Sequence, residues 1–400
     1  MNQIWQPAAV VLVLTLAIGL RFVSRLRGYQ FTAWILVAVT AAMIYPQAFT
    51  RWGSIDLRNK WLILGVVQAV MFGMGTQMKL DDFIGVVKKP RGVLVGIVCH
   101  FSVMPLVGLA LTKMFRFPPE IAAGIILIGS CSSGLASNVM AYIAKSNLVL
   151  SVAVTAITTM IAPLMTPFWM KLLANQYVPI SYVTMMMEII KIVLVPIGAA
   201  LLHDYLKHAS PRGRTAVLAI AAFGTAWLVF LAAGGWEMLR RNLSEEALAG
   251  FSIGGFLLSA FVIGVAYHWL TRWFPRLDRW MPALSMAGIV YFTTVTTAAG
   301  RDTLLQIGGL LFLAAVLHNT AGYFFGYWLS RGSGLDKNSA RSVAFEVGMQ
   351  NGGMASGLAG AMGKLGTVGL AAAIFSPWMN ISGSLLANYW KRRPVRNDNV

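Results

Sequence analysis

Long apolar stretches alternate with short polar segments along almost the whole chain. A helix that crosses the hydrocarbon core of a bilayer needs about 20 predominantly apolar residues, and about thirteen stretches meet this length. Because barrel strands would be near 10 residues long, we expect helices rather than a barrel. The predicted spans are approximately 8–24, 31–48, 61–78, 92–112, 119–145, 149–172, 182–202, 215–235, 250–270, 281–299, 304–329, 340–362 and 366–390.

Composition supports this pattern. Hydrophobic residues make up 57% of the 400 residues and charged residues only 12%, with a mean hydropathy of +0.68. The charged share is about half that of a soluble globular chain, which excludes a disordered protein and argues against a soluble enzyme. Cys99 and Cys131 both fall inside apolar spans without a CxxC pair, so we expect no disulfide framework and no transition-metal site. The predicted fold class is therefore an all-α polytopic membrane protein.

The basic residues indicate an orientation. The chain carries 32 Lys and Arg against 14 Asp and Glu, a net charge of +18. These cations sit in short clusters between apolar runs, so we expect contact with the lipid bilayer and no nucleic acid as a partner. Of the 32, 21 fall in alternate loops that begin with the loop after the first span. The positive-inside rule places those loops in the cytoplasm, with the N-terminus outside and the C-terminus inside.

Two predicted spans are interrupted in the middle by small and polar residues. The span 119–145 contains GSCSSGLASN at 129–138, and the span 340–362 contains EVGMQNGG at 346–353. Unwound backbone at membrane depth is tolerated only where it is buried in protein or lines a cavity. A matched pair of Gly-interrupted spans in two halves of a chain points to a transporter binding site. The alternative is a close helix crossing that uses small residues for packing.

The positions of these spans suggest an inverted repeat of five plus five helices, because each interrupted span is the fourth of its set. An odd number of spans inverts the second copy, and an inserted helix pair leaves that inversion intact. The predicted units are an extra N-terminal helix (1–28), a first repeat (29–176), the first helix of the second repeat (177–210), an inserted helix pair (211–276), the remainder of the second repeat (277–392) and a cytoplasmic tail (393–400).

Glu346 is the most informative polar residue. It lies inside an apolar span without a basic neighbour at helical spacing, whereas Glu188 has Lys191 three residues on and is expected to form a structural pair. An intramembrane carboxylate must be protonated or compensated by a cation. Gln350 follows at i+4, and the nearby glycines free carbonyl oxygens, a hard-oxygen set that suits Na⁺. The alternative is a protonated, hydrogen-bonded structural glutamate.

Other polar residues of the spans extend this hypothesis. Ser137 and Asn138 lie in the first interrupted span, and Ser151 and Thr155 share one face of the next helix. Taken alone, such hydroxyls more often bond to their own helix than to a ligand. The half-helices that start after each break present free N–H groups and a positive dipole end, which would attract an anion. We therefore predict an organic anion as substrate and sodium as the coupling ion.

The residues resemble the bile acid/sodium symporter family. The similarity covers about 31–210 and 278–392, and its motifs are GLASNVM at 134–140, LSVAVT at 150–155, EVGMQN at 346–351 and NISGSLL at 380–386. The resemblance implies a panel domain and a core domain, with two broken helices that cross in the core. It implies a first sodium site from Ser137, Asn138, Ser151, Thr155 and Glu346, a second from His100, Glu346, Val347, Met349 and Gln350, and substrate contacts at Leu135, Asn351 and Asn380.

The sequence departs from the family at three places. His100 stands where the family usually has a glutamine whose oxygen contributes to the second sodium site, and an imidazole nitrogen is a poor Na⁺ ligand. Met379 replaces a histidine found in a bacterial member, and the inserted pair 211–276 is absent from typical members. The second site is thus weak, rearranged or replaced by a titrating group, because the histidine pKa lies near physiological pH. A buried neutral His100 is the alternative.

The predicted function is sodium-coupled symport of a bile-acid-like anion or of a small carboxylate or sulfonate across a bacterial inner membrane. The first alternative is a proton-coupled anion transporter that uses His100 and Glu346. A distant alternative is an intramembrane enzyme on a lipid-linked substrate, which the scattered histidines and the lack of paired acidic motifs disfavour. We expect no cofactor. The sequence leaves the exact substrate, the sodium stoichiometry and the oligomeric state open.

Overall fold

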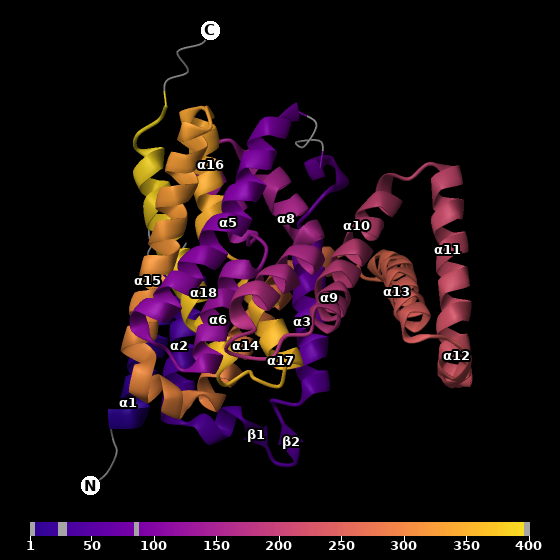
Figure 1. Ribbon diagram of the computed structural model, residues 1–400, viewed down its shortest axis with the longest axis horizontal. Helices are drawn as coiled ribbons and strands as arrows, with labels where there is room; N and C mark the ends of the chain where they lie inside the picture. The colour runs from indigo at the N-terminus through magenta and orange to yellow at the C-terminus, as the bar shows by residue number, and fades with distance from the viewer. Residues whose placement is uncertain (1–4, 23–29, 84–87, 396–400) are drawn as a thin grey trace.

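The computed structural model describes residues 5–22, 30–83 and 88–395, which are helical almost throughout (Figure 1). Within them the strands β1 (Arg51–Trp52) and β2 (Ile55–Asp56) form an antiparallel hairpin that the hydropathy pattern did not predict. Gly53 turns this hairpin with a φ of 57°, a conformation that glycine adopts without strain. The loop residues Arg25 and Arg27 and the end of the predicted tail, 396–400, lie outside the described residues.

Eight helices of the described chain are long and apolar enough to cross a membrane, which supports the predicted polytopic helical fold. The predicted number of about thirteen spans stays a prediction, because several apolar helices are shorter than a full crossing. The eight candidate spans are Pro90–Phe115, Leu148–Ala174, Tyr182–His208, Pro211–Asn242, Ala247–Trp273, Leu277–Ala299, Arg301–Gly332 and Val368–Lys391.

One group of helices corresponds to the expected panel. It consists of α2 (Gln30–Ile44), α3 (Lys60–Gly75), α9 (Tyr182–Ile189), α10 (Val195–His208) and α14 (Leu277–Ala299). A π-helical segment, η6 (Ile190–Leu194), joins α9 to α10. Glycines let the helices approach closely: a Cβ at Gly73 would lie 2.8 Å from the Met281 carbonyl oxygen, and one at Gly288 would lie 2.2 Å from Val70.

A second group corresponds to the expected core, and most fully buried side chains belong to it. Its continuous helices are α5 (Pro90–Phe115), α8 (Leu148–Trp169), α15 (Arg301–Gly332) and α18 (Val368–Lys391). A π-helical segment, η5 (Met170–Ala174), continues α8.

The two interrupted spans lie inside the core as pairs of half-helices. The first consists of α6 (Pro119–Ser130) and α7 (Ala136–Ile143), and the second of α16 (Lys337–Gly348) and α17 (Gly352–Ala361). The breaks are shorter than the interrupted runs in the sequence, and Glu346 lies in the last turn of α16 rather than in the break.

The two broken spans run in opposite directions. Glu120, in the first turn of α6, forms an ion pair with Lys364, which follows α17. At the other end, the Ser342 hydroxyl of α16 donates to the carbonyl of Asn147, just after α7 (2.8 Å). The start of α6 therefore lies beside the end of α17, as an inverted repeat requires. We call the end with Glu120, Lys364 and the strands the hairpin end (Figure 1).

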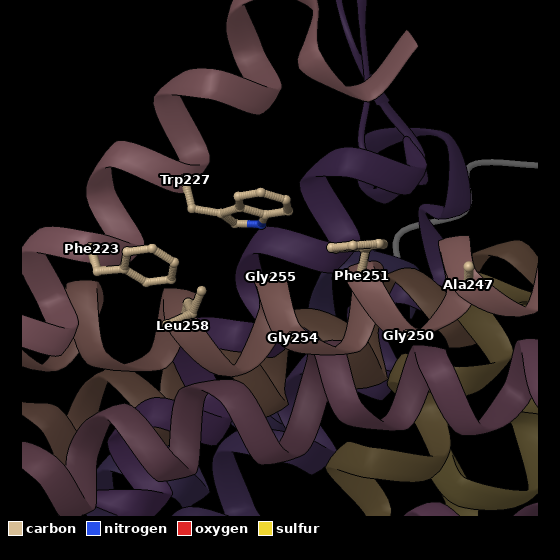
Figure 2. Close-up of a pocket in the computed structure, with 8 residues that line it drawn as sticks. All are labelled: Phe223, Trp227, Ala247, Gly250, Phe251, Gly254, Gly255 and Leu258. Atoms are coloured by element: carbon tan, nitrogen blue, oxygen red, sulfur yellow. The ribbon is translucent and has the colours of Figure 1, made fainter. Parts of the chain in front are cut away.

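Two additions pack on the panel. Helix α1 (Trp5–Gly19) contacts α2, while α11 (Pro211–Phe230) and α13 (Glu245–Trp273), linked by η7 (Leu231–Gly235) and α12 (Trp236–Asn242), stand beside α10 (Figure 1). An apolar groove of about 350 Å³ lies between α11 and α13. In it the rings of Trp227 and Phe251 are stacked, with their centroids 5.7 Å apart, beside Gly254 and Gly255 (Figure 2). The unit boundaries given from the sequence stay predictions.

The close approach of α6 to α18 makes a testable prediction. A Cβ at Gly124 would lie 2.3 Å from the Val368 carbonyl oxygen, so Gly124→Ala should lower the free energy of unfolding by about 1–3 kcal/mol through overpacking. Thermal unfolding in detergent would measure the loss. Gly309→Ala is the matched control, because nothing lies within 4 Å of a Cβ there and alanine favours a helix. Equal stability of the two variants would contradict the packing described.

Candidate functional site

The two breaks are joined backbone to backbone. The amide of Gly134 donates to the carbonyl of Met349 (3.0 Å), and the amide of Asn351 donates to the carbonyl of Ser132 (2.9 Å). Ser133 and Gln350 face each other as an isolated antiparallel bridge. Each break thus supplies hydrogen-bond partners that the interrupted helices leave free, which buried backbone requires.

Glycine at position 134 permits this contact. A Cβ on Gly134 would lie 2.7 Å from the Gln350 carbonyl oxygen, closer than two such atoms approach without a backbone shift. The glycine in the first motif is therefore explained by the second break, more than 200 residues away in the chain.

The carboxylate of Glu346 lies at this crossing and is 0% exposed. The Ser137 hydroxyl donates to its Oε1 (2.6 Å) and the Thr155 hydroxyl to its Oε2 (2.7 Å), while the Ser151 hydroxyl also contacts Oε1. The side-chain oxygen of Asn138 accepts from Ser151 (2.9 Å) and Thr155 (3.2 Å). All five residues predicted for the first sodium site therefore belong to one connected cluster of contacts.

This cluster contains more short oxygen–oxygen contacts than its hydroxyl hydrogens can turn into hydrogen bonds. The three hydroxyls make six contacts of 3.2 Å or less, counting the bond from Ser137 to the Gly134 carbonyl (2.8 Å). Each hydroxyl carries a single hydrogen. Among the described residues, no Lys, Arg or His side chain forms an ion pair with Glu346. The site is therefore rich in oxygen and lacks a compensating positive charge.

The residues predicted for the second sodium site lie nearby but are bonded to each other. The Gln350 amide nitrogen donates to the carbonyl of Val347 (2.8 Å), and the Met349 carbonyl accepts from Gly134. The Gln350 side-chain oxygen is buried and has no hydrogen-bond partner among the described residues. His100 is 0% exposed, with Nδ1 2.9 Å from the Glu346 carbonyl oxygen and Nε2 2.8 Å from that of Cys131.

The residues predicted to contact substrate lie at the breaks or beside them. Leu135 precedes α7 and is half-buried. Asn351 caps α17 by accepting from the Met354 amide (3.0 Å), and its amide nitrogen donates to the Ser132 hydroxyl (3.4 Å). Asn380 is half-buried on α18, where its side chain donates to the Ser376 carbonyl of the same helix (2.9 Å).

Other polar residues of the crossing had no assigned role in the sequence. The Ser133 hydroxyl contacts that of Ser137 (3.4 Å), and the i,i+4 spacing of these two serines was the available signal. The Asn319 amide nitrogen donates to the Gly348 carbonyl (2.8 Å), and Ser382 donates to the Asn319 oxygen (2.6 Å). His318 hydrogen-bonds to the Met104 carbonyl (2.8 Å) and so joins α15 to α5.

Comparison with known proteins identifies the family of the chain. Residues 64–239 match the Sodium Bile acid symporter family. The chain is 32% identical over 375 residues to the sodium-dependent transporter YocS of Bacillus subtilis, with 94% of each chain covered. It is 27% identical over 318 residues to the ileal sodium/bile acid cotransporter of Homo sapiens, which covers 78% of this chain and 72% of the human protein.

A solved structure shares the fold. The sodium proton antiporter MjNhaP1 of Methanocaldococcus jannaschii superposes with a TM-score of 0.53 at 13% identity, covering 98% of this chain and 99% of the antiporter. The identity with YocS, over nearly the full length of both chains, decides the assignment. The chain is a multi-pass membrane transporter, not an enzyme, and it belongs to the sodium bile acid symporter family.

Proposed function

We propose that this protein is a secondary active symporter that couples the uptake of an organic anion to sodium. The observation that carries the proposal is the oxygen cluster around Glu346, where three hydroxyl hydrogens serve six short oxygen contacts. A buried carboxylate without a compensating positive charge is costly. A bound cation offsets that cost and fills the contacts that the hydroxyl hydrogens leave open.

The chemistry of the donors favours Na⁺. Carboxylate, hydroxyl and amide oxygens suit a hard cation, whereas transition metals are held through nitrogen or sulfur ligands as well. In this proposal the first sodium site is formed by Ser137, Asn138, Ser151, Thr155 and Glu346. Sodium is transported here and is not a resident cofactor.

The second sodium site rests on one unpartnered atom, the buried side-chain oxygen of Gln350. Glu346 and the carbonyls of Val347 and Met349 complete the proposed set, and the Gln350 amide nitrogen must leave Val347 for that carbonyl to bind an ion. His100 contributes nitrogen rather than oxygen at this place. The second site is accordingly the weaker of the two.

The half-helices supply the attraction for an anion. Helices α7 and α17 begin directly after the two breaks, so their positive N-terminal ends point toward the crossing. Leu135, Asn351 and Asn380 lie there as the proposed substrate contacts. The human relative named for bile acid cotransport supports an anionic substrate of the bile acid, carboxylate or sulfonate kind.

Transport follows from the division into panel and core. Sodium bound at the crossing neutralises Glu346 and orders the two breaks, after which the anion binds beside them. The core then rocks against the panel and exposes the crossing to the other side of the membrane. By the positive-inside rule the hairpin end and the N-terminus face outward and the C-terminus lies in the cytoplasm, in a bacterial inner membrane.

A second candidate function, anion transport coupled to protons, is favoured by the surroundings of His100. Both ring nitrogens lie within 2.9 Å of carbonyl oxygens. A neutral imidazole has a single N–H, whereas the protonated ring donates from both nitrogens. This candidate differs from the first in its ion dependence.

Glu346→Gln tests the sodium site. Sodium should raise the unfolding temperature of the purified native chain more than K⁺ or choline does, because binding at 100 times Kd raises the free energy of unfolding by about 2.7 kcal/mol. The variant should lose this difference because the amide removes the charge that holds the ion. Glu188→Gln is the matched control, since Glu188 also lies in an apolar span and pairs with Lys191 (3.1 Å). Sodium-specific stabilisation that persists in Glu346→Gln would refute the site.

His100→Gln separates the two candidate functions. For a sodium symporter, the amide oxygen should strengthen sodium-specific stabilisation, and the native chain should respond only weakly to pH between about 5 and 8, the range in which histidine titrates. Thermal unfolding at several pH values in Na⁺ and in choline would measure both effects. Stabilisation that follows pH without sodium specificity, and that His100→Gln removes, would favour proton coupling instead.

A further inference from the structure

A cavity of about 440 Å³ lies at the hairpin end, away from the crossing. Its panel walls are the start of α3 and the segment from Val178 to Glu188, and its core wall is the end of α17 with Lys364. Because panel and core both line it, the cavity changes shape whenever the two groups move relative to each other.

Among the charged residues described around this cavity, one cation forms no ion pair. Lys364 forms an ion pair with Glu120, and Glu188 forms one with Lys191 (3.1 Å). Lys60 lines the cavity and makes no ion pair with any described residue. The walls therefore carry an excess of about one positive charge.

Lys60 occupies an unfavourable place for a cation, because the helix dipole adds to the positive potential there. It is the first residue of α3, at the positive end of the helix dipole, where acidic residues are preferred. Asn59 caps the helix by accepting from the Trp61 amide (2.9 Å) and does not neutralise the lysine. The hydroxyls of Ser181 and Thr184 at the start of α9 add polar groups to the same cavity.

The remaining walls are apolar. Val178, Ile180, Leu358 and Met362 face the cavity beside the charged rim. An apolar wall with one charged group selects a ligand that has a hydrophobic body and an ionised head of opposite sign. A small, fully polar anion would have no apolar surface to pack against these walls.

We propose that this cavity captures an organic anion with an apolar body before it reaches the crossing, and that Lys60 binds its charged group. The inference rests on the proposed anion transport and adds a second site on the same route. Lys191 also has a role in it, because it neutralises Glu188 and so preserves the positive excess.

The charge preference of the cavity is measurable without knowing the substrate. Ala361→Cys places a thiol in the core wall, and the native cysteines, which are buried, supply the background rate. The thiol is modified in parallel by anionic 2-sulfonatoethyl methanethiosulfonate and by the cationic trimethylammonioethyl reagent. The ratio of the anionic rate to the cationic rate is then divided by the same ratio measured for free N-acetylcysteine. Thr184→Cys in the panel wall repeats the measurement if the first variant fails to fold.

Three further substitutions should change the anion-to-cation rate ratio in different ways. Lys60→Ala should lower the anion-to-cation rate ratio roughly fivefold by removal of one nearby charge, and Glu188→Gln should raise it. Lys113→Ala is the matched control, an exposed lysine near the end of α5 outside the cavity, and should leave the ratio unchanged. A ratio that Lys60→Ala leaves unchanged, or that Lys113→Ala lowers equally, would overturn the proposal.

Protection by cholate tests whether the cavity prefers an anion with an apolar body. In lipid nanodiscs, cholate should slow modification of Ala361→Cys and should fail to do so when Lys60→Ala is also present, whereas acetate at equal ionic strength should have no effect. Equal protection by acetate, or none by cholate, would overturn the capture site. Failure of the sodium test at Glu346 with cholate protection intact would reject sodium coupling and leave the capture site standing, so the two failures are distinguishable.

Discussion

The pairing of two interrupted helices through their backbones is the interaction on which the rest of the structure depends. In a bilayer, an unwound segment has no water to satisfy its amides and carbonyls. Gly134 and Asn351 donate across the gap to Met349 and Ser132, so each break is stable only in the presence of the other. The two halves of the chain must therefore assemble together, and the crossing exists only in the complete core.

This pairing also positions the chemistry. Glu346 lies one turn before the second break, and the Asn319 amide holds the Gly348 carbonyl at the end of the same half-helix (2.8 Å). With the backbone held on both sides, the hydroxyls of Ser137, Ser151 and Thr155 converge on the carboxylate. At the sodium site proposed above, the cation would be the one variable element, so its binding would act directly on both breaks.

The sequence predicted the helical membrane fold and the two interrupted spans, and it singled out Glu346, because an acid among apolar residues is a clear signal. It placed the breaks too broadly. Gly129 stays helical and serves close packing, since a Cβ there would lie 2.6 Å from the Met104 carbonyl oxygen. Glycine marks both breaks and close contacts, and one chain alone does not separate them. The bond from Gly134 to Met349 joins residues too distant in the chain for any local pattern.

In the described part of the chain, the extensive contacts of the two additions are with the panel. Helix α1 packs on α2, and α13 packs on α10 and η6. Every added helix in lipid increases the viscous drag on the body that carries it. The heavier drag then falls on the panel, and the core performs the larger share of any relative movement. In the transport movement proposed above, the inserted pair would therefore slow the panel in the membrane, and the core would make the larger displacement.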